Sequence, residues 1–135
     1  MISQVLEHVV EPGVWLARAS ALLASGGVLF ASIPNFRSLL VAAMGARESN
    51  ICPPTHNNFF TRASFTRAAA DHRLGTVRLE TPSVRSSGFA IDAVSTYLRL
   101  PRPVTVLPGL AVRALLAATD PLGRGRFLHG YSRAT

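Results

Sequence analysis

Two histidines and their polar neighbours are the side chains of this sequence best suited to chemistry. His8 follows Glu7 near the start of the chain, and His56 precedes Asn57 in a segment bordered by Phe59. An imidazole titrates near neutral pH, so either ring can accept a proton from a hydroxyl nucleophile. The alternative roles are structural: His8 would satisfy backbone groups at a helix entrance, and His56 would be a loop histidine exposed to solvent.

The sequence predicts no metal site. The residues with potential ligand atoms that we considered are His8, Cys52, His56 and His72. Their spacings match none of the standard ligand patterns. The single cysteine also excludes a disulfide scaffold and leaves too few thiolates for a structural zinc site.

The elements that must position these residues alternate between helices and strands. Residues 28–33 form a continuous apolar run, which is typical of a strand buried on both faces. Helices are expected to begin at Pro12 and after Thr61, where proline and threonine suit a helix start. Further strands are expected at 76–81, with Val77 facing inward, and at 127–134, and a strand stub at 2–6. Further helices are expected at 36–44, 89–100 and 109–119, with a proline-rich break at 101–108. The alternation predicts an α/β fold.

Several short segments together resemble a known family. They read VLEHV at 5–9, Glu-Pro at 11–12, LASGG at 23–27, SIPN at 32–35, and His56 followed by FFT at 59–61 and SF at 64–65. In this order and at these spacings they resemble the S-adenosylmethionine-dependent methyltransferases of the seven-stranded class I fold. The resemblance covers residues 1 to about 81.

The resemblance implies the C-terminal half of a Rossmann-like methyltransferase sheet, with helices on both faces. The strands would match the family's fourth (as a stub), fifth, sixth and seventh, and the last would run antiparallel between the other two. Residues 1–135 would then form one partial domain, with 82–126 as a helical insertion or cap within it. The family's Gly-rich cofactor loop would lie before Met1, so we expect the chain to be a truncated domain that is inactive alone.

The resemblance also implies an activity, which is methyl transfer from S-adenosylmethionine to a hydroxyl or amine of a small-molecule acceptor. His8 or His56 would be the catalytic base. The expected cofactor contacts are Ser3, Gln4 and Glu7. Ser3 and Gln4 are alternatively a polar pair on the surface. The expected substrate contacts are Pro34, Asn35, Asn57 and Phe59. Asn35 is favoured as the first residue of an Asx-turn, a role compatible with substrate binding.

Other classes of function rest on weaker features. A non-enzymatic remnant or interaction module would keep the half-fold without binding a cofactor. The net charge of +7 could indicate nucleic-acid binding, but all fourteen basic residues are arginines scattered along the chain, so we expect no nucleic-acid partner. The apolar, arginine-flanked segment 107–118 could lie on an anionic membrane, although a cap over the substrate pocket or a dimer contact is favoured.

The start of the sequence resembles no targeting signal, because Glu7 and His8 occupy the place of its apolar core. The free Cys52 suits a reducing compartment, so we expect a cytoplasmic protein. No run approaches the roughly 20 apolar residues of a membrane span. An apolar strand with an open edge invites self-association, and we expect oligomers through an exposed sheet edge.

Overall fold

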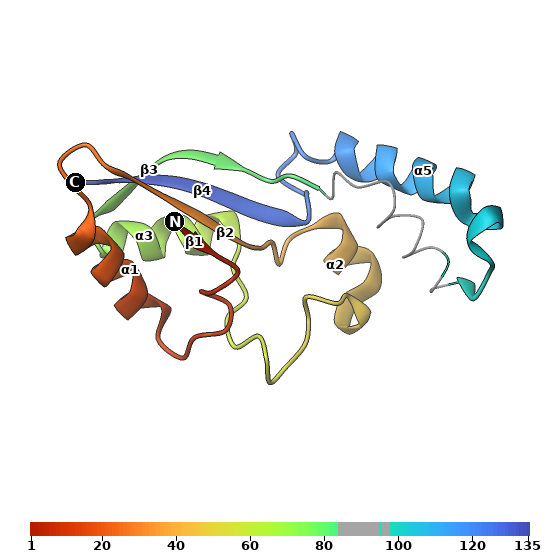
Figure 1. Cartoon of the computed structure of the whole chain (residues 1–135), viewed down its shortest axis with the longest axis horizontal. Coiled ribbons are helices and arrows are strands. Elements are labelled where there is room, and N and C mark those ends of the chain that lie inside the picture. Colours follow the sequence, from red (N-terminus) through yellow and green to blue (C-terminus); the bar gives the residue numbers. More distant parts are fainter. Residues whose placement is uncertain (84–94, 96–97) are drawn as a thin grey trace.

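A computed structural model describes residues 1–83, 95 and 98–135 and shows an α/β arrangement (Figure 1). The strands are β1 (Ile2–Ser3), β2 (Val28–Pro34), β3 (Leu74–Glu80) and β4 (Phe127–Ala134). The helices are α1 (Pro12–Leu22), α2 (Leu39–Met44), α3 (Arg62–Asp71) and α5 (Arg102–Ala118), and a 3-10 turn covers Gly45–Arg47. The expected helix at 89–100 falls mostly outside the described residues.

The four strands form one mixed sheet in the order β1-β2-β4-β3. β1 runs parallel to β2, whereas β4 runs antiparallel to both β2 and β3. The β2–β4 ladder is continuous from Val28 opposite Arg133 to Pro34 opposite Phe127. The prediction that the last strand is inserted, reversed, between the two earlier ones is therefore confirmed.

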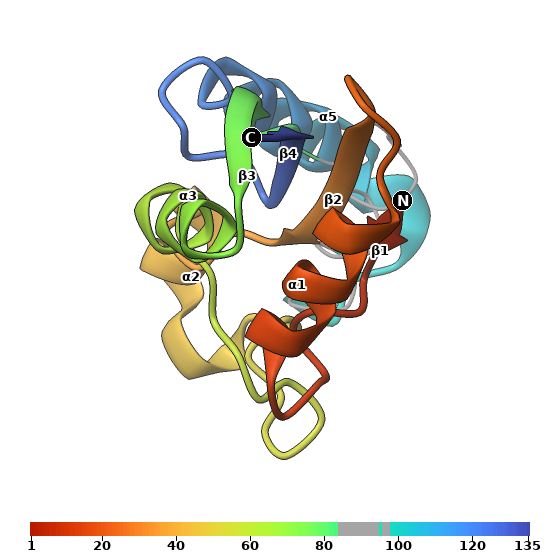
Figure 2. The ribbon, with the colours of Figure 1, turned by 90° about the vertical axis from the view of Figure 1, so that its left-hand side faces the viewer.

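The main core lies between the sheet and helices α1 and α3, which lie next to each other beneath the strands (Figure 2). Leu29, Ala31 and Ile33 of β2 face this layer and are buried, as alternation along a strand requires. The core also contains Leu6, Leu16, Phe60, Phe65, Ala69, Leu74 and Leu128. Helices α2 and α5 lie beyond the end of the sheet at which β2 finishes (Figure 1).

Two helix starts follow the sequence closely. α1 has Glu11 as its N-cap and a proline in its first turn. α3 is capped by Thr61, whose hydroxyl accepts from the Ser64 backbone N–H while the Ser64 hydroxyl accepts from the Thr61 N–H. This reciprocal capping fixes where α3 begins, and with it the end of the loop that carries His56.

The expected break at residues 101–108 is wrong, because α5 is continuous from Arg102 to Ala118. Pro101 is the N-cap and Pro103 lies in the first turn, where a missing N–H costs no helical hydrogen bond. Pro108 lies inside the helix, where it removes one such bond. α5 nevertheless stays helical on both sides of Pro108.

The expected inward orientation of Val77 is also wrong. The register between β3 and β4 shifts between Thr76 and Arg78, so that Val77 has no partner in the ladder, and its side chain is 58% exposed. Such a bulge inserts one residue and interrupts the alternation of faces. Leu79, beyond the bulge, packs against the core as expected.

β2 is paired along its whole length with β4, but on its other edge only Ala31 and Ser32 pair with β1. The open edge expected for this strand therefore covers Val28–Phe30 and the last two residues, Ile33 and Pro34. Self-association through that edge stays a prediction.

We expect Gly130→Ala to destabilise the fold by about 1–3 kcal/mol, because a side chain there overpacks the core. A Cβ at this buried position in β4 would lie 2.7 Å from Cζ of the Phe65 ring. Urea denaturation followed by circular dichroism measures the change. In a Phe65→Leu background the same substitution should cost less, and an equal cost in both backgrounds would contradict this contact as the cause.

Candidate functional site

The segment that carries Glu7 and His8 follows β1 directly and lies at the edge of the sheet where β1 and β2 both end. Gln4 ties this segment to β2, because its backbone N–H donates to the Ser32 carbonyl at 2.8 Å and its side-chain amide donates to the same oxygen at 3.2 Å. Ligands of open α/β sheets bind outside the carboxyl ends of the strands. The structure therefore places Glu7 and His8 at the edge expected for a site.

A second loop is hydrogen-bonded onto this segment through two asparagines. The backbone N–H groups of Asn57 and Asn58 both donate to the Glu7 carbonyl, at 2.7 and 3.1 Å. The Asn57 amide donates to the His8 carbonyl, and the Asn58 amide to the Leu6 and Val9 carbonyls. These bonds join residues about fifty positions apart and fix the distance between the two loops.

The two predicted catalytic histidines meet across this junction. Their ring centroids lie 4.5 Å apart at an interplanar angle of 73°. Nδ1 of His8 lies 2.8 Å from the Thr55 carbonyl oxygen, and Nδ1 of His56 lies 2.8 Å from that of Asn50. Because a carbonyl oxygen only accepts, both Nδ1 atoms must carry the proton. In the neutral rings each Nε2 therefore keeps a free lone pair.

Glu7 lies beneath this pair. Its side chain is 1% exposed, and neither carboxylate oxygen has a hydrogen-bond partner among the described residues. Oε1 lies 3.9 Å from Nε2 of His8, whose side chain is 42% exposed. Of the three expected cofactor contacts, Glu7 thus faces the histidines, whereas the Gln4 amide is bonded to Ser32 and Ser3 is exposed.

The structure does not bring His8, Cys52, His56 and His72 together as one group. His72 lies at the far end of α3, next to Gly13 at the start of α1, and Cys52 does not join the cluster. The structure instead groups Glu7 with His8 and His56, with one potential ligand atom of each lying within 4.8 Å of the others. Spacing along the chain could not show this, because the second loop is placed by Asn57 and Asn58.

The expected substrate contacts divide into two kinds. Asn35 is buried, and its amide donates to the Gly123 and Gly125 carbonyls while its oxygen accepts from the Arg37 N–H. This is the favoured Asx-turn, and it leaves no amide proton for a substrate. Asn57 supports the His8 segment, as described above.

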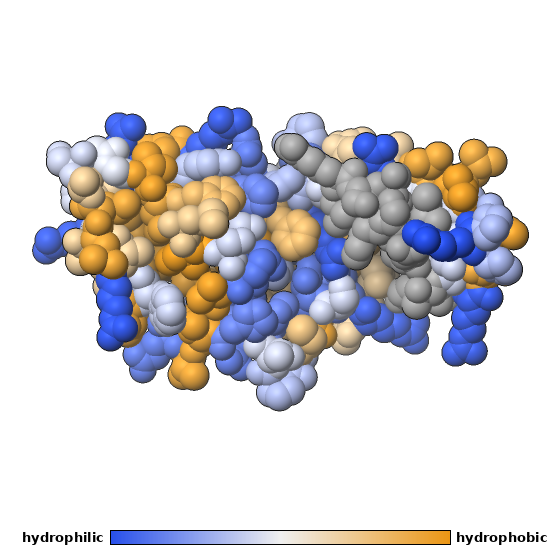
Figure 3. Space-filling view, viewed as in Figure 1, coloured by the Kyte–Doolittle hydropathy of each residue, from blue (hydrophilic) through white to orange (hydrophobic). Residues whose placement is uncertain are grey.

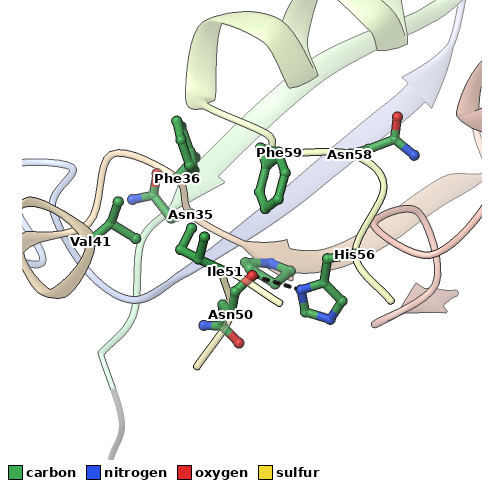
Figure 4. A pocket seen from close by; sticks show the side chains of 9 residues that line it. Asn35, Phe36, Val41, Asn50, Ile51, His56, Asn58 and Phe59 are labelled. Atoms are coloured by element: carbon green, nitrogen blue, oxygen red, sulfur yellow. Dashed lines mark hydrogen bonds between the residues drawn. The ribbon is translucent and has the colours of Figure 1, made fainter. Parts of the chain in front are cut away.

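Pro34 and Phe59 line a small hollow next to His56, together with Phe36, Val41 and Ile51 (Figure 4). The Phe36 and Phe59 rings lie 5.1 Å apart and form one wall. The hollow has about 10 Å³ of free volume, which is room for roughly one water molecule. The lining also includes the polar side chains of Asn50, His56 and Asn58.

No described residue of α5 lines this hollow. α5 instead exposes apolar side chains at one end of the molecule (Figure 3), among them Val104, Leu107 and Leu115. The predicted role of this region as a cap over the substrate pocket stays a prediction. Among the described residues, no helix is long and apolar enough to cross a membrane.

We expect Asn58→Ala to destabilise the protein by about 1–3 kcal/mol, because two half-buried carbonyls lose their donor. Asn57→Ala is the matched control: its amide makes one exposed bond, so its cost should stay below about 1 kcal/mol. Urea denaturation of both variants gives the two values. Equal costs would contradict the larger role given to Asn58.

Sequence reasoning missed the groups that orient the histidines. They are the backbone carbonyls of Asn50 and Thr55, and every residue type carries such a carbonyl. It also missed the buried ion pair between Glu48 and Arg126, in which Oε1 and Nη2 lie 3.1 Å apart. Nothing in the local sequence marks this pair, because its members come from distant segments.

Comparison with known proteins shows the fold alone. No model of a protein family matches the chain, and no curated protein matches it. One solved structure with the same fold is a complex between the Haloferax volcanii Trm112 methyltransferase activator and a protein identified as a candidate methyltransferase. The TM-score is 0.55 at 11% sequence identity, over 98% of this chain and 51% of the matched one. The chain thus spans about half the length of the structure it resembles.

Proposed function

We propose that this chain forms the acceptor-side half of an S-adenosylmethionine-dependent methyltransferase. The main support is the placement of Glu7, His8 and His56 at the carboxyl edge of a sheet whose last strand is reversed and inserted. Among the segments that resemble the family, VLEHV and SIPN lie at this edge, whereas LASGG precedes β2 at its opposite end. The solved structure with the same fold includes a candidate methyltransferase, which agrees with the proposal.

In this proposal the cofactor supplies the methyl group, and the residues of this chain hold the acceptor. Ser3, exposed at the carboxyl end of β1, is one of the proposed cofactor contacts. In this proposal the free lone pair on Nε2 of His8 or His56 takes the proton of a hydroxyl or amine. Phe36 and Phe59 would hold its apolar part.

Cofactor binding by the natural gene product tests the proposal. A C-terminal affinity tag added at the chromosomal locus retains whatever chain precedes Met1. Mass spectrometry then gives the length of the product, and calorimetry gives its affinity for S-adenosylmethionine. We expect micromolar binding. A folded natural product with no measurable affinity would contradict the proposal.

A second candidate is an interaction module without catalysis. It is favoured by the solved structure being a complex with an activator protein, and by the outer edge of β1, which pairs with no other described strand. The calorimetry above separates the two candidates, because an interaction module need not bind the cofactor.

A further inference from the structure

We propose that Glu7, His8 and His56 bind one divalent transition-metal ion. A potential ligand atom of each lies within 4.8 Å of the other two. Nitrogen and oxygen ligands bind such ions at about 2.0–2.2 Å, so two ligands on opposite sides of one ion lie at most about 4.4 Å apart. The 3.9 Å between His8 Nε2 and Glu7 Oε1 already meets this limit. The third ligand, within 4.8 Å of the others, must come closer by side-chain rotation.

The buried carboxylate is the first independent reason to expect a cation. Glu7 is 1% exposed, and no described residue donates a hydrogen bond to either of its oxygens. Burying an ionised carboxylate without partners is strongly unfavourable, and buried polar groups in native proteins are almost always paired. A cation between Glu7 and the two rings would supply the missing partner.

The orientation of the imidazoles is the second reason. Both rings donate Nδ1–H to a backbone carbonyl, those of Thr55 and Asn50, at 2.8 Å (Figure 4 shows the bond of His56). Metal-binding histidines are characteristically held in this way, because the bond fixes the tautomer and aims the other nitrogen at the ion. Here it leaves Nε2 of each ring free to bind.

The ligand set indicates which ions fit. Two imidazole nitrogens and one carboxylate oxygen suit Zn²⁺, Fe²⁺, Co²⁺ or Mn²⁺, whereas Mg²⁺ and Ca²⁺ prefer sites made of oxygen atoms. The side chain of His8 is 42% exposed, so the site is open to solvent on one side. Three protein ligands with open positions are typical of catalytic rather than structural metal sites. The inference does not rest on the proposed function: an ion held by both Nε2 atoms would occupy the lone pairs assigned to the base, so base catalysis by these rings applies to the metal-free site.

Cobalt titration of the 135-residue chain tests the site. Cys52→Ser removes the one thiol that could compete for the metal. We expect one equivalent of Co²⁺ to give visible d–d absorption without a thiolate band, and one equivalent of Zn²⁺ to abolish it. His56→Ala removes a ligand and should weaken Co²⁺ binding by at least the 10–100-fold that follows the loss of a residue hydrogen-bonded to a metal ligand. His72→Ala, a histidine outside the cluster, should bind Co²⁺ like the parent.

Glu7→Gln separates a ligand from a purely structural residue. The amide keeps the volume but removes the charge, so we expect weaker Co²⁺ binding together with unchanged or higher stability of the metal-free protein in urea. A parent chain that is folded by circular dichroism but binds no stoichiometric Co²⁺ would overturn the proposal. Equal Co²⁺ affinities of the parent and Glu7→Gln would overturn it as well, as would displacement of Co²⁺ by equimolar Mg²⁺.

Discussion

Under the proposed function, replacement of His8 by alanine is expected to lower the turnover of the natural gene product by about a hundred- to ten-thousand-fold, the usual contribution of a general base. The affinity for S-adenosylmethionine should stay unchanged, because the ring of His8 lies against His56 and Glu7 rather than against Ser3. Steady-state kinetics and calorimetry on the natural gene product measure the two quantities separately.

His72→Ala is the matched control, since it removes an imidazole far from the site and should leave turnover within a few-fold of the parent. A loss of only a few-fold for His8→Ala would return His8 to a structural role at the start of α1. A large loss for His56→Ala alone would assign the proton transfer to the second loop. The loss of a base and the loss of a cation ligand both lower turnover. The cobalt spectrum of each variant distinguishes them, because only the loss of a ligand weakens Co²⁺ binding.

Removal of Glu48 is expected to destabilise the protein by about 3–5 kcal/mol, as for other buried ion pairs that lose one partner. The side chains of Glu48 and Arg126 are 2% and 7% exposed, and Nη2 of Arg126 donates to Oε1 of Glu48 at 3.1 Å. The second carboxylate oxygen accepts the Asn50 N–H at 2.7 Å. Glu48→Ala therefore leaves a buried guanidinium without this carboxylate, and urea denaturation measures the cost.

Exchanging both partners for apolar residues is the control. The double variant Glu48→Leu with Arg126→Met buries no charge at this place and should recover much of the lost stability. If the double variant were as unstable as the sum of its single changes, packing rather than charge would explain the loss. Glu48→Ala should also disturb the orientation of His56, because the carbonyl that holds its Nδ1 belongs to Asn50.

Much of the fold could be predicted because local signals agreed with tertiary packing. β4 was expected at 127–134 and covers Phe127–Ala134, and the Thr61 cap was correctly placed before α3. The two wrong predictions, at 101–108 and at Val77, arose where tertiary packing overrode a local sequence preference. α5 continues through Pro108. Strict alternation assigned Val77 to the inner face of the sheet, but the bulge turns its side chain outward.

The candidate site was predicted less completely than the fold. His8 and His56 were selected by residue type and by resemblance, and the structure brings their rings together. The third member, Glu7, was expected from the resemblance to contact a cofactor. Nothing in the sequence shows that its carboxylate is buried next to the two rings. Asn35 was named as a substrate contact, although its amide is fully used within the fold.

The central position of β4 also constrains how the protein forms on the ribosome. β2 is synthesised well before the strand that completes its ladder, which consists of residues 127–134. Until those residues leave the exit tunnel, β2 and β3 cannot be joined, and both present unpaired edges. Nascent chains in this state are prone to aggregation. The sheet is therefore expected to form only after residues 127–134 have left the tunnel, so that a stall shortly before Phe127 would leave a protease-sensitive nascent chain.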